Sequence, residues 1–156
     1  MMIFFFGCSP LKKFENSKSI FESEVQKLEG LTDYKKLDNY ILFIGSSSIR
    51  RWDNMVQQMA PYQVVKRGYG GAHFYDLIHF TERLVTPHHN AKALICFVAN
   101  DISGKDKDLS SKEVFRLFKF FTRQVHRIHP ELPIYFIEIT PTPSRWKVWD
   151  QISDVN

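Results

Sequence analysis

Short apolar runs alternate with segments of helical periodicity along most of this chain, and this alternation restricts its fold more than any other feature. Apolar runs suited to buried strands lie at residues 40–44, 62–65, 92–99 and 132–140. Apolar residues recur at helical spacing in residues 12–28, 73–85 and 110–128, and residues 146–156 begin another helix. Strands alternating with helices predict a three-layer α/β/α fold with a parallel sheet and right-handed crossovers.

Several helix ends carry local signals. Ser110 and Glu113 have the spacing of a capping box and predict a helix start at residue 111. The apolar stripe of this helix contains Val114, Phe118, Phe121, Val125 and Ile128. Pro87 and Pro130 follow the helices predicted at residues 73–85 and 110–128, as expected where a helix stops.

The chain has 156 residues, of which 44% are hydrophobic, so residues 12–156 suffice for one domain and leave no room for a second. Residues 1–11 form a separate N-terminal segment. Its apolar part is too short to span a membrane. Gly7-Cys8 resembles the end of a bacterial lipoprotein signal, which predicts lipidation of Cys8 and an extracytoplasmic, membrane-anchored protein of a bacterial envelope. In the alternative interpretation, the segment packs against the body of its own domain and the protein is cytoplasmic.

The formal charge is +4, and Lys and Arg are scattered along the chain in nothing longer than pairs. A nucleic-acid groove usually needs a denser basic stripe, so the composition argues against nucleic acid as a partner. The two cysteines do not form a disulfide framework, because Cys96 lies within an apolar run and is expected in the core.

In a parallel α/β sheet, ligands bind beyond the carboxyl ends of the strands, so the loops after the strands are the candidate sites. The first of these loops reads Gly45-Ser46-Ser47-Ser48. Three interpretations fit it: an anion site, a nucleophilic serine, or serines that only cap the next helix.

The loops after the first three strands together resemble the SGNH, or GDSL-like, hydrolases. The resemblance covers residues 38–156 and implies a flavodoxin-like fold in which Ser47 is the nucleophile. The backbone N–H of Ser47, Gly71 in Gly68-Tyr69-Gly70-Gly71, and Asn100 in Val98-Ala99-Asn100-Asp101 would form the oxyanion hole. Val98 stands where the family usually has glycine.

The family's fourth block, an Asp-x-x-His pair near the C-terminus, has no counterpart here. Asp76 and His79 have that spacing, but they fall on a predicted helix and are interpreted as a chance match. The other histidines, expected to be ordinary surface residues, are His73, His88, His89, His126 and His129. The resemblance therefore implies a chain that is incomplete at its C-terminus and nearly inactive alone. Without the family's last strand and helix, residues 134–139 would form an exposed apolar edge.

Residues 140–149 resemble a segment of this family in which Arg145 and Trp146 would line the substrate pocket. The resemblance implies a serine esterase acting on an acylated carbohydrate or a short-chain ester, without a metal or organic cofactor. Two alternatives remain open: an inactive fragment or lipoprotein that binds acylated glycans, and a flavodoxin-like phosphate or nucleotide binder. The oligomeric state is left open.

Overall fold

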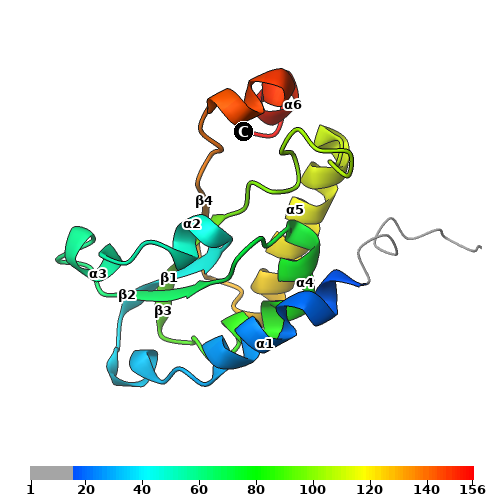
Figure 1. Ribbon diagram of the computed structural model, residues 1–156. Coiled ribbons are helices and arrows are strands. Elements are labelled where there is room, and N and C mark those ends of the chain that lie inside the picture. The colour runs from blue at the N-terminus through cyan, green and yellow to red at the C-terminus, as the bar shows by residue number, and fades with distance from the viewer. Residues whose placement is uncertain (1–15) are drawn as a thin grey trace, which may run out of the picture.

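The computed structural model describes residues 16–156 and contains one parallel sheet with the strand order β2-β1-β3-β4 (Figure 1). β1 is central and almost entirely buried, as its unbroken apolar sequence predicts. The strand bounds are β1 Tyr40–Gly45, β2 Val64–Gly68, β3 Ala91–Phe97 and β4 Ile134–Phe136.

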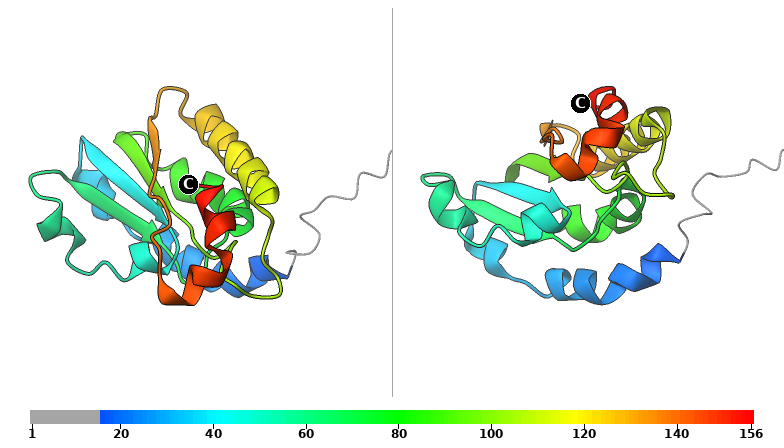
Figure 2. Two further views of the ribbon diagram at one scale, coloured as in Figure 1. Left: turned by 90° about the horizontal axis from the view of Figure 1, so that it is seen from above. Right: turned by 45° about the horizontal axis from the view of Figure 1, so that its top comes forward.

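Helices cover both faces of the sheet unequally. Three long helices lie side by side on one face, with α4 in the middle (Figure 1): α1 Ser17–Glu29, α4 Phe74–Val85 and α5 Ser111–Ile128. Within residues 16–156, the other face carries two single-turn helices, α2 Ser47–Arg50 and α3 Met55–Gln58. The remaining helices are η2 Asp33–Lys36, η3 Pro143–Val148 and α6 Trp149–Ser153. Figure 2 shows α6 beside the start of α5, where Ser111 Oγ donates a hydrogen bond to the Gln151 carbonyl. The predicted three-layer α/β/α class is confirmed.

Alternate residues of β1 point to the two layers. Leu42 and Ile44 belong to the large core under the long helices, whereas Phe43 packs with Ile49 and Met55 from the short ones. This is the period-two pattern of a strand buried on both faces. Cys96 is fully buried in the large core, as predicted.

Three strand predictions have bounds that are wrong by two residues or more. The second strand begins at Val64 and continues to Gly68, and Tyr62 before it is 64% exposed. The third strand ends at Phe97 rather than at residue 99. The fourth strand is only three residues long, because it pairs with only Leu94 to Cys96 of β3. β4 lies at the end of the described sheet, and Tyr135 and Ile137 are 58% and 43% exposed. The expected exposed apolar edge is therefore present in residues 16–156.

The predicted helices are confirmed with small shifts. The capping box at the start of α5 is formed, with the Glu113 N–H donating to Ser110 Oγ and the Ser110 N–H donating to Glu113 Oε2. The N-terminal helix is confirmed from Ser17 onward. Cys8 lies outside the described residues. Across the part of the chain that is described, the structure has no helix long and apolar enough to cross a membrane.

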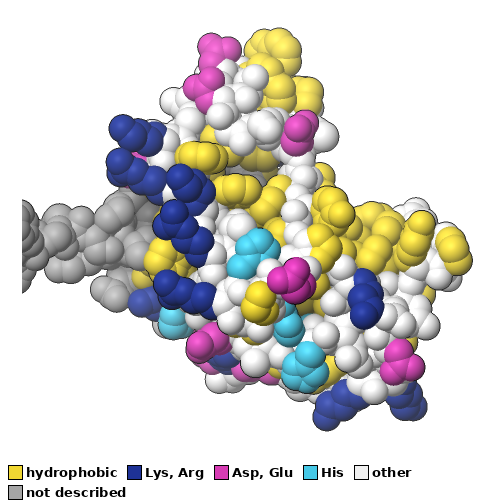
Figure 3. Space-filling model, turned by 180° about the vertical axis from the view of Figure 1, so that it is seen from behind, with side chains coloured by type: hydrophobic (Ala, Val, Ile, Leu, Met, Phe, Trp, Pro, Cys, Tyr) yellow, Lys and Arg dark blue, Asp and Glu magenta, His cyan; other side chains and the backbone are white. Residues whose placement is uncertain are grey.

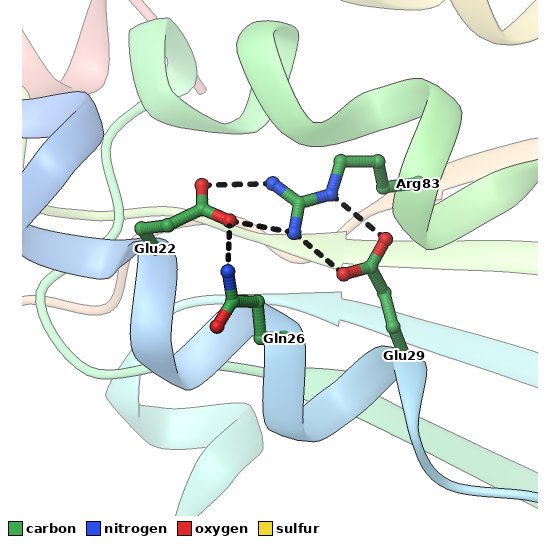
Figure 4. A network of polar contacts seen from close by, with 4 residues as sticks. All are labelled: Glu22, Gln26, Glu29 and Arg83. Atoms are coloured by element: carbon green, nitrogen blue, oxygen red, sulfur yellow. Dashed lines mark hydrogen bonds and ion pairs between the residues drawn. The ribbon is translucent and has the colours of Figure 1, made fainter.

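An ion-pair network fastens α1 to α4 (Figure 4). The guanidinium of Arg83 on α4 donates to both carboxylate oxygens of Glu22 at 2.8 Å and also pairs with Glu29, both on α1. Gln26 donates to Glu22 at 2.9 Å. Hydrogen bonds from Arg83 lower the pKa of the Glu22 and Glu29 carboxyls. The network fixes α1 on the helical layer, and α1 in turn supplies a carboxylate to the site described next.

Candidate active site

The loops that carry the predicted site residues leave the same edge of the sheet. In the strand register, Gly45 at the end of β1 lies opposite Gly68 of β2 and Phe97 of β3. Ser47 follows Gly45 by two residues, and Gly71 and Asn100 each follow their strands by three. The structure therefore brings all three to one edge, where ligands bind in folds of this class.

The serine loop turns sharply at Gly45, whose φ of +129° is unfavourable for residues with a side chain. The Ser46 N–H then donates to the Phe97 carbonyl at 2.9 Å, and α2 begins at Ser47. Ser46 is the N-cap residue, but its side chain makes no capping hydrogen bond. The capping interpretation is therefore wrong for Ser46. The Ser47 side chain is half-buried, and no other group in residues 16–156 hydrogen-bonds its hydroxyl.

The short helix α2 sits directly on the end of β2. A Cβ atom at Gly68 would lie 2.6 Å from the Cβ of Ile49, so only glycine lets the helix approach this closely. Ile49 is buried in a smaller core, which it forms with Phe43, Met55 and Val64. This contact holds the turn of helix that begins with Ser47.

The glycine loop after β2 is tied to α1 and α2 through one carboxylate. Glu24 accepts a hydrogen bond from the Gly70 N–H and another from Arg50, both at 2.9 Å. Gly71 has a φ of +78°, and a Cβ there would touch only Phe21, at 3.6 Å. The positive φ angle of this residue, rather than a lack of space for a side chain, explains why it is a glycine. Sequence analysis missed Glu24, because nothing along α1 distinguishes it from the other acidic residues.

Asn100 bridges two of the loops. Its side-chain amide donates to the Ala72 carbonyl at 2.8 Å, directly after Gly71. The neighbouring Asp101 accepts from the Phe74 N–H at 3.0 Å, at the start of α4. The loops after β2 and β3 are thus joined by two hydrogen bonds, and the second N–H of the Asn100 amide is left for another acceptor.

The segment after β4 reaches this edge through Arg145. Its guanidinium donates to the Ala99 carbonyl at 3.3 Å, one residue before Asn100. Trp146 is 67% exposed and lines an open groove with Pro141, Thr142 and Pro143. Arg145 therefore supports the Asn100 loop, whereas Trp146 faces solvent.

The histidines need one correction. His88 is buried rather than on the surface: it lies 2.8 Å from the Tyr40 hydroxyl, and burial lowers the pKa of its imidazole to about 4. The carboxylate of Asp76 accepts from the backbone N–H of His73, the N-cap residue of α4. His79 is exposed and its ring packs against Phe80.

Comparison with solved structures decides the fold. A protein from Streptococcus pneumonia assigned as a platelet activating factor matches 91% of this chain, with a TM-score of 0.69 and 20% identity. An acylhydrolase assigned in Bacteroides fragilis NCTC 9343 matches 86%, with a TM-score of 0.63 and 17% identity. A GDSL-like lipase of Bacteroides thetaiotaomicron VPI-5482 matches 88%, with a TM-score of 0.57 and 14% identity. The chain has the fold of the SGNH, or GDSL-like, hydrolases.

The match to this SGNH-like fold is structural. No protein-family model matches the chain, and no curated protein matches its sequence. The chain spans 65% of the length of the first of these structures and 67% of the other two.

Beside the Asn100 loop, the SGNH-like fold of this chain contains a cavity of about 190 Å³ with both apolar and polar side chains in its walls. Its walls come from β3, β4, α4, α5 and the C-terminal residues, and they include Phe74, Val98, Asp101, Phe118, Phe136 and Val155. Asp101 is 4% exposed, and no group in residues 16–156 hydrogen-bonds its Oδ1. Within the described residues, no group of three or more His, Cys, Asp or Glu could hold a metal ion.

Titration of Asp101 predicts a loss of stability with rising pH. Burial raises the pKa of this carboxyl from 3.8 to about 6. Between these values the folded chain retains a proton that the unfolded chain has released, so the free energy of unfolding falls as pH rises. We expect this group to lower it by about 1–3 kcal/mol between pH 4 and pH 7. Urea denaturation across this range measures the fall as the difference between the wild type and Asp101→Asn, because Glu22 and Glu29, whose pKa is lowered, change the free energy of unfolding in the opposite direction.

Asp101→Asn should remove that fall, because the amide can still accept from the Phe74 N–H but does not ionise. Asp38→Asn is the control, since Asp38 is exposed. An Asp101→Asn chain that keeps the wild-type pH dependence would show that Asp101 is not the group responsible.

Proposed function

We propose that this chain is the nucleophile-bearing part of a carboxylic-ester hydrolase, with Ser47 as the nucleophile. The observation that carries the proposal is the hydrogen bond from Asn100 to Ala72. This hydrogen bond joins the loop of Asn100, one proposed oxyanion donor, to Ala72. Ala72 directly follows Gly71, the other proposed donor, and both loops leave the edge of the sheet where Ser47 lies.

The proposed chemistry follows from these positions. Ser47 Oγ attacks the ester carbonyl carbon, and the carbonyl oxygen becomes an oxyanion. The N–H groups of Ser47 and Gly71 and the free amide N–H of Asn100 would donate to it. Collapse of this intermediate breaks the bond to the alcohol and leaves an acyl-serine, which water then hydrolyses. The proton of the Ser47 hydroxyl would pass to a base and from it to the departing alcohol. We assign this base to none of residues 16–156, because none of them hydrogen-bonds the Ser47 hydroxyl.

The substrate class we propose is a short-chain acyl ester, including O-acetyl groups on carbohydrate. Trp146 offers an exposed aromatic face for the alcohol part, and Arg145 keeps the adjacent loop in place. The acylhydrolase and the lipase among the similar structures support ester chemistry for this fold. No metal or organic cofactor has a part in this mechanism.

A second candidate is an acylated-glycan binding protein without turnover. The lack of a hydrogen-bond partner for the Ser47 hydroxyl among the described residues favours it, since an activated nucleophile needs a base. The phosphate or nucleotide binder is less well supported. Glu24 pairs with Arg50 on α2, so the positive charge of the short helix that begins with Ser47 is already partly neutralised by a carboxylate.

We also propose that Cys8 is lipidated and that the protein lies on the outer side of a bacterial membrane. The support is the sequence Gly7-Cys8 after an apolar stretch. Growth with a labelled fatty acid tests it: the label should be incorporated, and Cys8→Ser should abolish incorporation. Equal labelling of both chains would contradict a lipid on Cys8.

Covalent labelling tests the esterase proposal directly. A fluorophosphonate reacts once per nucleophilic serine, so even a slow reaction accumulates over hours. We expect mass spectrometry of the labelled chain to find the phosphonyl group on Ser47. An unlabelled wild-type chain, or one labelled at another residue, would contradict the assignment.

A further inference from the structure

The outer face of α5 carries a continuous basic stripe that the linear sequence hides. The five cations are spaced three or four residues apart, which places them along one side of an α-helix. They are Lys112, Arg116, Lys119, Arg123 and Arg127. All five are exposed, and the opposite side of the helix buries Val114, Leu117, Phe121 and Val125 in the core. The scattered charge inferred from the sequence therefore gathers on one surface.

These cations are not neutralised within the described residues. Across residues 16–156, none of the five forms a salt bridge or a hydrogen bond through its side chain. The fold pairs other cations closely, as Arg83 shows with two glutamates (Figure 4). The α5 stripe thus leaves its positive charge available to an external anionic partner.

Two phenylalanines flank the stripe on either side. Phe115 and Phe120 are 53% and 49% exposed, although large apolar side chains are usually buried. Lys119 lies over the ring of Phe115, 5.2 Å from its centre. Figure 3 views the molecule from behind and shows Lys and Arg side chains in a column with apolar side chains beside them. A surface of cations with protruding aromatic rings suits the interface of an anionic bilayer.

We propose that the outer face of α5, defined by these five cations and two phenylalanines, binds the surface of an anionic phospholipid membrane. The cations would contact lipid phosphates and carboxylates, and the two rings would enter the headgroup region. Nucleic acid would also attract the cations, but it gives no reason for exposed rings on both sides of the stripe. This inference does not depend on Ser47 or on Cys8.

The orientation leaves the proposed active site open. α5 packs lengthwise on the sheet, and its first residue lies near the edge that carries Ser47 and Asn100, because the Leu109 N–H donates to the Asp101 carbonyl. A membrane along α5 would therefore lie against the side of the molecule and would not cover that edge. An ester carried by the membrane or by the adjacent envelope would be within reach.

Vesicle sedimentation tests the proposal with the full 156-residue chain. The probes are vesicles of phosphatidylcholine with about 30% phosphatidylserine, and vesicles of phosphatidylcholine alone. We expect the chain to sediment with the anionic vesicles and not with the neutral ones, with binding weakened by salt. Replacing three cations, as Arg116→Gln, Lys119→Gln and Arg123→Gln, should lower the partition coefficient about 100-fold.

The matched control removes the same charge elsewhere, as Lys35→Gln, Lys36→Gln and Lys92→Gln, which are all exposed and lie away from α5. It should keep most of the binding. A second variant, Phe115→Ser with Phe120→Ser, should weaken vesicle binding about tenfold or more but leave any binding to a DNA duplex unchanged. Equal losses in the two charge variants would overturn the proposal. Equal binding of the wild-type chain to anionic and neutral vesicles would also overturn it. So would a phenylalanine variant that binds both DNA and anionic vesicles as strongly as the wild type.

Discussion

Replacing Ser47 with alanine is expected to abolish fluorophosphonate labelling of residue 47. The substitution removes the hydroxyl oxygen that would form the bond to phosphorus. The structure limits the effect to chemistry, because the Ser47 side chain is only half-buried and has no partner in residues 16–156 to lose. Folding should therefore be preserved, and the circular dichroism spectrum should match that of the wild type.

Ser48→Ala is the matched control for this substitution, since Ser48 is the next residue and is exposed on the same turn of α2. It should label at the wild-type rate. If Ser48→Ala loses labelling and Ser47→Ala keeps it, the nucleophile has been assigned one residue too early. Labelling is a better measure than turnover here, because catalytic groups act as a unit and a missing base would mask the contribution of the serine to turnover.

The fold was predictable largely from patterns that depend on neighbouring residues. The capping box at Ser110 and the amphipathic stripe of α5 are local signals, and both are confirmed. The fourth strand was predicted too long, because only residues 134–136 pair with β3, although β3 itself runs from Ala91 to Phe97. The apolar run at residues 132–140 does not record where this pairing stops. The burial of His88 likewise depends on Tyr40, which is 48 positions away in the chain.

The site residues likewise divide into those that the sequence identified and those that only contacts between distant segments reveal. The residues Ser47, Gly71 and Asn100 were chosen by resemblance, and the strand register places their loops at one edge. The contacts that hold those loops were not foreseen, because they join distant segments. Glu24 on α1 binds Gly70 and was missed altogether, whereas Arg145 was expected to line the pocket and binds Ala99. The basic face of α5 was missed for a simpler reason. Cations spaced three and four residues apart look scattered in the linear sequence, but in an α-helix they lie along one side.

Replacing Gly45 with alanine is expected to destabilise the fold by at least about 3 kcal/mol. A Cβ atom at this position would lie 2.1 Å from the Phe97 carbonyl oxygen, so the ends of β1 and β3 would have to separate. The same carbonyl accepts the hydrogen bond of the Ser46 N–H, which that separation would break. The φ of +129° adds backbone strain for any residue with a side chain.

Urea denaturation measures this effect, with Gly30→Ala as the control. Gly30 follows α1 in a helical conformation, and a Cβ there would meet no atom closer than 3.5 Å. Its replacement should leave the free energy of unfolding unchanged or raise it by up to about 1 kcal/mol. Because Ser47 follows Gly45 by two residues, any Gly45→Ala chain that still folds should also label more slowly. A Gly45→Ala chain as stable as Gly30→Ala would contradict the close approach of β1 to β3 on which the site is built.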